Sequence, residues 1–105
     1  MSSGWARVSI PFRPAFKEAL LSGVKTCTAR TSKKGKPGDL FTAFGAVFQL
    51  MSVERVPLHE VADFWYQEGC TDRDHFIAVW NEIHPRVGYR PKQLVYLHQF
   101  RKVMD

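Results

Sequence analysis

Residues 23–30 concentrate hydroxyl groups and cations in one short stretch, which reads Gly-Val-Lys-Thr-Cys-Thr-Ala-Arg. After the glycine the pattern takes a period of two, so Thr26, Thr28 and Arg30 fall on one side of a predicted strand. Small apolar residues alternate with them and fall on the other side. A polar face of this kind is unusual for a simple core strand. We therefore treat this stretch as the candidate functional site.

A cationic run begins at the end of this stretch. Arg30 is followed by Lys33, Lys34 and Lys36, and then by a Pro-Gly turn. Cations in a loop beside a cleft can contact the phosphates of a nucleic acid. The same run also fits a solvated loop whose charges serve solubility. The whole chain carries a net charge of +5, which is compatible with a polyanionic partner but does not require one.

Other catalytic and metal-binding signatures are absent from the sequence. It contains no glycine-rich phosphate loop, no GxSxG, no HExxH and no CxxC pair. The histidines lack metal-ligand spacing, so we expect no metal and no other cofactor. Cys27 falls on the apolar side of its strand, where a small buried hydrophobic residue is the ordinary interpretation.

The elements that must position the candidate site begin with a short amphipathic helix over about residues 14–22. Gly23 then stands where a left-handed helix cap belongs. Residues 8–10 could start a strand before this helix. Further strands are predicted over residues 40–44 and 47–56, rich in Val, Phe, Leu and Met.

Two helices are predicted after these strands. The first closes at Glu68-Gly69, and the residues on its apolar face are Leu58, Val61, Phe64 and Trp65. The second opens at Thr71, which forms a variant capping box with Asp74, and His84-Pro85 stops it. Its apolar residues are Phe76, Val79, Trp80 and Ile83.

A closing strand over residues 93–103 completes the series. The order of strand, helix, several strands, two helices and a final strand favours an α+β fold. We expect a small mixed β-barrel with helices at its ends, not a doubly wound sheet.

Length and composition predict one domain over residues 1–105 in a reducing compartment. The 45% hydrophobic and 13% aromatic residues can bury a core without metal or disulfide bonds. Two cysteines fit the cytoplasm better than a disulfide framework. Residues 1–4 lack the basic start and apolar run of a signal peptide, and no stretch is long enough to cross a membrane. We therefore expect a cytoplasmic protein that does not associate with membranes.

The candidate stretch and the residues after it resemble a known family. Gly-x-Lys-Thr-x-Thr-x-Arg, followed by a Lys/Gly-rich turn and Gly38-Asp39, is similar to the signature of the ASCH family. The order of the helices, the His84-Pro85 break and the closing strand agree, so the resemblance covers roughly residues 10–103. It implies a PUA-like β-barrel with about three short helices packed around it, and a cleft beside the motif that binds RNA.

One bacterial branch of this family comprises small N(4)-acetylcytidine amidohydrolases. The resemblance implies that Lys25 is the proton acceptor, Thr28 the nucleophile and Glu68 the proton donor. A threonine hydroxyl is inert unless a base removes its proton, and a lysine is a base only when neutral. Partial burial and the neighbouring Arg30 would favour the neutral form. Because the lysine and the threonine are three residues apart, the lysine must lie in the turn before the strand for both to face one site.

Each of these residues also has a purely structural interpretation. Lys25 follows a helix C-terminus, where a cation interacts favourably with the helix dipole. The threonines are ordinary strand residues with high β-propensity. Glu68 could be a solvated charge at a helix end, and Arg30 could pair with Asp39 or another acid and simply stabilise the barrel.

Two functions of different classes follow as hypotheses. The first is a cleft lined by Lys25, Thr28, Arg30 and Glu68 that hydrolyses the amide of an N(4)-acylated cytidine. The second is a non-catalytic RNA-binding module linked to RNA metabolism or translation. In that module the cationic loop grips phosphates and Thr26 contributes to the surface. Tyr89, in a second basic loop, is a candidate for stacking on a base. The expected partner is RNA or a modified nucleoside in either case.

Overall fold

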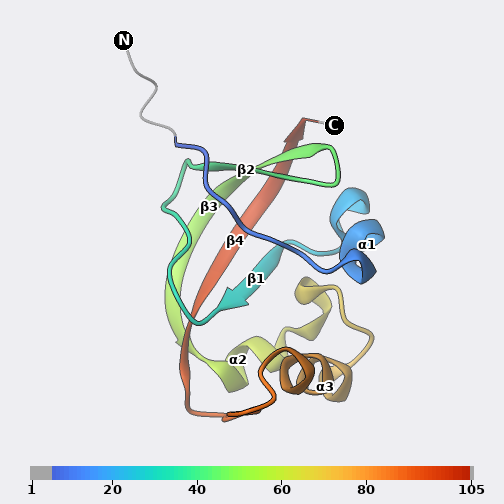
Figure 1. Cartoon of the computed structure of the whole chain (residues 1–105), viewed down its shortest axis with the longest axis vertical. Helices are drawn as coiled ribbons and strands as arrows, with labels where there is room; N and C mark the ends of the chain where they lie inside the picture. The colour runs from blue at the N-terminus through green and yellow to red at the C-terminus, as the bar shows by residue number, and fades with distance from the viewer. Residues whose placement is uncertain (1–5, 105) are drawn as a thin grey trace.

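The computed structural model describes residues 6–104, and Figure 1 shows its ribbon. The expectation about the first four residues therefore falls outside the described part. In chain order the elements are η1 (Pro14–Phe16), α1 (Lys17–Ser22), β1 (Cys27–Arg30), β2 (Leu40–Ala43), β3 (Ala46–Pro57), α2 (Leu58–Asp63), η2 (Trp65–Glu68), α3 (Arg73–Ile83) and β4 (Leu94–Met104).

The strands form one antiparallel sheet in the order β1-β4-β3-β2. The long strands β3 and β4 run side by side through its middle, and β1 lies at an edge (Figure 1). The register between β3 and β4 shifts at Val47/Phe48 and again at Leu50/Ser52. Such irregularities bend a strand and increase its twist. The sheet accordingly curls into half of a barrel, which confirms the predicted α+β fold with a barrel-like sheet and helices around it.

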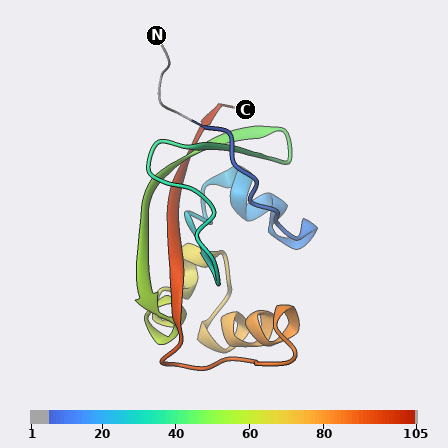
Figure 2. The same ribbon diagram turned by 60° about the vertical axis from the view of Figure 1, so that its left-hand side comes forward.

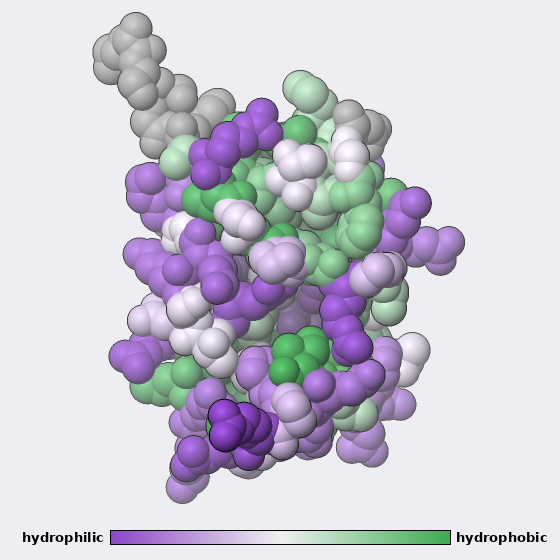
Figure 3. Space-filling model, in the orientation of Figure 1, coloured by the Kyte–Doolittle hydropathy of each residue, from purple (hydrophilic) through white to green (hydrophobic). Residues whose placement is uncertain are grey.

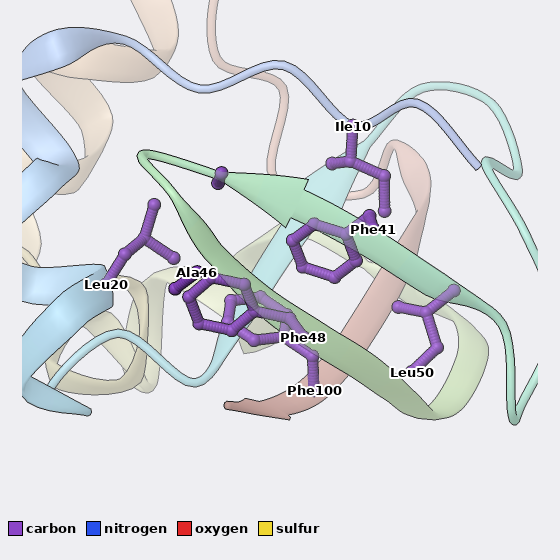
Figure 4. Close-up of a cluster of buried hydrophobic side chains, with 8 residues drawn as sticks. Ile10, Leu20, Phe41, Ala46, Phe48, Leu50 and Phe100 are labelled. Carbon is purple, nitrogen blue, oxygen red and sulfur yellow. The ribbon is translucent and has the colours of Figure 1, made fainter. Parts of the chain in front are cut away.

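One hydrophobic cluster packs against β2 and the adjoining parts of β3 and β4, which lie in the upper part of Figure 1; Figure 4 shows its side chains. Its aromatic centre is made by Phe41, Phe48 and Phe100, whose ring centroids lie 5.2–5.5 Å apart. Ile10 and Leu20 close over these rings, so the cluster holds both the N-terminal segment and α1 against the sheet. Burial of each large apolar side chain stabilises the fold by roughly 1.5–3 kcal/mol.

A second cluster holds α2 and α3 to the lower part of the sheet. Leu58 and Val61 contribute from α2, and Phe76 and Trp80 from α3. Phe16 packs against both clusters. Consequently α1 and α3 lie one above the other on the same side of the sheet (Figure 2), with β1 between them.

Local sequence explains where the helices begin and end. Gly23 takes a left-handed conformation with φ 84° and ends α1, as its position predicts. The predicted capping box at Thr71 and Asp74 is wrong. Asp72 is the N-cap of α3, because its extended backbone lets its carboxylate accept a hydrogen bond from the backbone N–H of His75 at 2.7 Å.

Two other expectations about elements are also wrong. Residues 8–10 form no strand. One parallel bridge joins Arg7 to Leu40, and the following prolines prevent a longer ladder. Phe64 is 49% exposed rather than buried, because α2 ends at Asp63 and a 3₁₀ turn follows. Phe64 is the C-cap of α2 and has a non-helical backbone (φ −103°, ψ 37°), so its side chain leaves the apolar face of the helix.

No helix in the described part of the chain has the length and apolar character needed to cross a bilayer.

Candidate functional site

A cleft of about 560 Å³ opens at the edge of β1, between the two hydrophobic clusters. Phe12 and Phe16 line it on the side of α1, and Phe76 and Trp80 line it on the side of α3. Lys25, Thr28 and Glu68 also line the cleft, although each is almost fully buried. These three polar groups therefore belong to its deep end. The space-filling view shows the surface hollowed between β1 and α3, with hydrophilic side chains in the recess (Figure 3).

Lys25 lies in the turn between α1 and β1. Its backbone N–H donates to the carbonyl of Ala19, and β1 begins only at Cys27. The lysine is thus outside the regular alternation of the strand, and it lines the same cleft as Thr28. This is the arrangement that the assignment from the ASCH resemblance requires.

The Lys25 side chain is 4% exposed, and its ammonium group is held by Glu68. Nζ donates to the main-chain carbonyl oxygen of Glu68 at 2.8 Å and lies 3.5 Å from its carboxylate Oε2. On its other side Nζ lies 4.7 Å from the ring centroid of Phe16, a favourable cation–π distance. The dipole of α1 is therefore a minor part of its environment, because a carboxylate and a carbonyl contact the cation directly.

Glu68 ends the short helix η2 and is brought to the cleft by a close backbone approach. Gly69 follows it with φ 80°, and a Cβ at this glycine would lie 3.2 Å from Cβ of Lys25. Glycine is therefore needed both for the conformation and for the space. Oε2 of Glu68 also accepts from Sγ of Cys27 at 3.4 Å. Burial, and then the negative charge of Glu68, raise the pKa of the Cys27 thiol far above its usual value, which makes Cys27 a poor nucleophile.

Arg30 fixes the hydroxyl group of Thr28. Its Nε donates to Thr28 Oγ1 at 3.0 Å, and its Nη2 donates to the carbonyl of Pro11 at 2.6 Å. Because Oγ1 accepts from the guanidinium group, its own hydrogen stays free to be donated or removed. Burial lowers the pKa of Arg30, and the nearby charge of Glu68 opposes this effect. The suggested pair between Arg30 and Asp39 does not form, since Asp39 bonds with Lys36.

The wall formed by α3 carries an indole group without a hydrogen-bond partner. Trp80 is 4% exposed, and its Nε1 is buried without an acceptor in the described residues. Its ring stacks on His84 with the centroids 4.1 Å apart. Sequence periodicity marks Trp80 as a core residue, which it is, but gives no sign that it also lines the cleft. The available sequence signal for this wall was the spacing of Trp80 and His84, which lie one helical turn apart and therefore on the same face at the end of α3.

Charged side chains meet at the mouth of the cleft. Arg13, from the segment before α1, and Glu82, from α3, both line it and form an ion pair at 3.2 Å. Lys34 lies on the rim as well. The mouth is thus exposed and charged, whereas the deep end is buried and holds Lys25 and Glu68.

The other predicted site residues lie outside the cleft lining. Thr26 is exposed, and its backbone N–H donates to the carbonyl of Gln67. Lys33 is exposed, and Lys36 pairs with the buried Asp39. Tyr89 borders a separate shallow hollow, where its hydroxyl accepts from Arg73. The structure therefore brings together Lys25, Thr28, Arg30, Lys34 and Glu68, and leaves the others apart from them.

The donor atoms of the cleft suit proton transfer and hydrogen bonding. A hydroxyl, an amine and a carboxyl group lie at its deep end, with aromatic rings on both sides. Nowhere in residues 6–104 do three or more His, Cys, Asp or Glu side chains gather in a geometry that could hold a metal ion.

Comparison with known proteins places the fold. No protein-family model matches the sequence, and no curated protein matches it. Solved structures do match. An ASCH domain from Lactobacillus crispatus JV V101 superposes with a TM-score of 0.68 at 18% identity, over 96% of this chain and 80% of that one. The chain has the fold of an ASCH domain.

Two further structures with the same fold are similar to this chain. The hypothetical protein PH0355 has a TM-score of 0.65 at 15% identity, over 94% of this chain and 98% of that one. Protein EF3133 from Enterococcus faecalis V583, of family DUF984, has a TM-score of 0.64 at 19% identity, over 99% of this chain and 78% of that one. At these identities the similarity establishes the fold alone.

Proposed function

We propose that the cleft binds the base of a modified nucleoside and hydrolyses the amide of an N(4)-acylated cytidine. The observation that carries the proposal is the contact between Lys25 and Glu68 at the deep end of a cleft whose lining also includes Thr28. A buried amine, a buried carboxyl group and a hydroxyl group in one cleft are the types that acyl transfer from nitrogen requires.

The shape and lining of the cleft support a base as the ligand. Its volume of about 560 Å³ lies within the range of about 300–1,000 Å³ typical of small-molecule sites. Aromatic rings from the α1 side and from α3 offer flat surfaces for a planar base. With the base at the deep end, the sugar would point to the exposed mouth near Arg13 and Lys34.

The buried pair can supply both a base and an acid. Transfer of a proton from Nζ of Lys25 to the carboxylate of Glu68 leaves a neutral amine and a carboxylic acid. The amine can then accept the hydroxyl proton of Thr28, and the acid can protonate the departing amine of the base.

The reaction balances as two acyl transfers. Oγ1 of Thr28 attacks the acyl carbonyl carbon, the carbon–nitrogen bond breaks, and cytidine leaves with a proton from Glu68. An ester on Thr28 remains. The carboxylate of Glu68 then deprotonates a water molecule, which attacks the ester carbon, and the ammonium group of Lys25 returns a proton to Oγ1 as the ester bond to Thr28 breaks. The sum is acylcytidine plus water giving cytidine plus a carboxylic acid.

Turnover of N(4)-acetylcytidine tests the proposal. Purified protein is incubated with the nucleoside, and free cytidine is followed by chromatography. Thr28→Val removes the hydroxyl at nearly constant shape, and Thr26→Val is the matched control because Thr26 is exposed and outside the cleft. We expect cytidine from the wild type and from Thr26→Val, and none from Thr28→Val or Lys25→Ala. Equal rates of cytidine release by Thr28→Val and the wild type would rule out Thr28 as the nucleophile.

RNA binding without catalysis is the second candidate function. It is favoured by the open mouth of the cleft, where Lys34 lines the rim and the exposed Lys33 lies next to it in the chain. Because Lys36 already pairs with Asp39, neutralising Lys33 and Lys34 should reduce the salt dependence of RNA binding more than neutralising Lys36. Equal effects of the three substitutions would contradict this interface.

A further inference from the structure

His98 is a fully buried histidine that neither of the proposed functions uses. It lies in β4 with 0% of its surface exposed, opposite Thr28 of β1 in the sheet register. Its Nδ1 is 3.0 Å from the carbonyl oxygen of Tyr96 and 3.3 Å from that of Thr28. Its Nε2 is 3.0 Å from the backbone nitrogen of Lys34. One imidazole thus joins β4, β1 and the cationic loop.

These contacts fix the protonation state of the ring. A backbone N–H can only donate, so Nε2 must accept from Lys34 and carry no hydrogen. The single hydrogen is then on Nδ1, which faces two carbonyl oxygens. The imidazole is neutral in this arrangement, and a second proton on Nε2 would point directly at the N–H of Lys34.

The environment opposes that second proton. Burial lowers the pKa of His98, and the charges of Arg30 on β1 and Lys34 in the loop lower it further, against the two backbone carbonyls. On β3 the register neighbour is Val53, which does not titrate. The histidine therefore keeps its loop contact at neutral pH and loses it on acidification.

The contact sets the position of the loop at the cleft. Later parts of the loop are held elsewhere: the N–H of Lys36 donates to Asp39, and that of Gly38 donates to the carbonyl of Leu50. Of the three loop residues held by these bonds, Lys34 lines the cleft, whereas Lys36 and Gly38 do not.

We propose that His98 is a positioning residue that places Lys34 on the rim of the cleft, and that protonation of His98 releases this cation. The inference deepens the proposed function, because it assumes that a base in the cleft directs its phosphates to this rim. It predicts that affinity for a phosphate-bearing ligand falls at acidic pH, while affinity for the uncharged nucleoside changes little.

Two substitutions separate the hydrogen bond with the N–H of Lys34 from the other contacts of the imidazole ring. His98→Gln puts an amide oxygen near the position of Nε2, so it retains an acceptor for Lys34 but does not titrate. His98→Asn reaches only the position of Nδ1, so it retains the bonds to the strand carbonyls and loses the loop. Urea denaturation of both variants verifies that they fold.

The affinity test compares cytidine with a cytidine trinucleotide, whose phosphodiesters keep their charge between pH 8 and pH 5. For the wild type, the ratio of trinucleotide to cytidine affinity should fall only below about pH 6.5, because the pKa of His98 is lowered from that value. Full protonation should lower the ratio about threefold to tenfold, the worth of one hydrogen bond. The ratio should be constant and high for His98→Gln, and constant and low for His98→Asn. Lys34→Ala should lower the ratio at every pH and abolish its pH dependence. A ratio for the wild type that does not change with pH, or one for His98→Asn that equals that of His98→Gln, would overturn the proposal.

Hydrogen exchange in the free protein tests the anchor without any ligand. The amide of Lys34 should exchange at least about tenfold faster in His98→Asn than in His98→Gln, because only the second retains its acceptor. Equal exchange rates would overturn the positioning role itself. If the Lys34 amide behaves as expected but neither cytidine nor the trinucleotide binds, the proposed function is wrong, whereas the positioning of the loop by His98 is supported.

Discussion

Replacing Lys25 by methionine removes the ammonium group and keeps an unbranched side chain of similar length. The methionine can still pack against Gly69 and the ring of Phe16, which the lysine chain contacts now. The substitution removes the hydrogen bond of Nζ to the Glu68 carbonyl at 2.8 Å and the ion pair with its carboxylate. The carboxylate then remains buried, and within residues 6–104 the thiol of Cys27 is the donor left to it.

The expected cost follows from the burial of both partners, which are 4% and 7% exposed and are therefore little screened by water. Removing one partner of a buried pair costs about 3–5 kcal/mol, whereas removing both together costs much less. Since about 1 kcal/mol shifts the melting temperature of a domain of this size by roughly 4–8 °C, Lys25→Met should lower it by about 12 °C or more.

Urea denaturation of four proteins measures this coupling: wild type, Lys25→Met, Glu68→Gln and the double variant. Each single substitution should be strongly destabilising, and the double variant should lose clearly less than the sum of the two. Singles that each cost under about 1 kcal/mol, or whose costs add in the double variant, would refute a buried pair at the deep end of the cleft.

Three more predictions concern groups around the cleft. Asp39→Asn should cost about 2 kcal/mol at pH 7, because the buried carboxylate accepts from the N–H of Lys36 at 2.9 Å and from its Nζ at 3.0 Å. The first of these bonds holds the pKa of Asp39 below its usual range despite its burial. This stability is therefore present above about pH 4 and is lost as the pH falls through the lowered native pKa, so the difference between the urea curves of variant and wild type should shrink as the pH falls below about 4. A difference that stays constant down to the acid unfolding of the wild type would contradict this reasoning. Burial chiefly raises the pKa of Cys70 to about 11. Its thiol should therefore react with iodoacetamide at pH 8 more than about a hundredfold slower than a free thiol, as followed by mass spectrometry. A rate equal to that of a free cysteine peptide would refute its burial. Arg30→Lys cannot bond Thr28 and Pro11 with two nitrogens of one rigid fork, so both turnover and melting temperature should fall, and unchanged values would remove Arg30 from the site.

Much of the scaffold could be predicted because its signals are local. The helix ending at Gly23 follows from a glycine that must adopt a positive φ. The long strands β3 and β4 follow from runs of Val, Phe and Leu close to their observed limits. The N-cap of α3 was missed because Thr71 and Asp72 are adjacent residues of equally suitable type, and only the backbone conformation distinguishes them.

The candidate site could be predicted only in part, because the cleft is assembled from three distant segments. Lys25, Thr28 and Glu68 were found through the resemblance of a contiguous motif and one helix end. The aromatic walls were not, since a periodic pattern identifies Trp80 as buried without telling which cavity it borders. Tyr89 has the right chemistry for stacking, yet its loop packs near Asn81 and outside the cleft.

The role of His98 also depends on contacts that are distant in the sequence. The sequence places it in a strand without metal-ligand spacing, which gave no reason to single it out. Its importance comes from contacts with the carbonyl of Thr28 and the N–H of Lys34, which are 70 and 64 residues away along the chain. Such long-range hydrogen bonds depend on sheet register, which no local pattern specifies.

The central claim is that the cleft at the edge of β1 is the ligand site, and a titration with N(4)-acetylcytidine followed by NMR tests it most directly. The Thr28→Val variant prevents turnover during the measurement. We predict that shifts concentrate on the amides of Ala29 and Phe76 and on the indole N–H of Trp80, with little change at Thr26. Shifts that gather instead around Tyr89 and Gln93, or no shifts at millimolar nucleoside, would contradict the account.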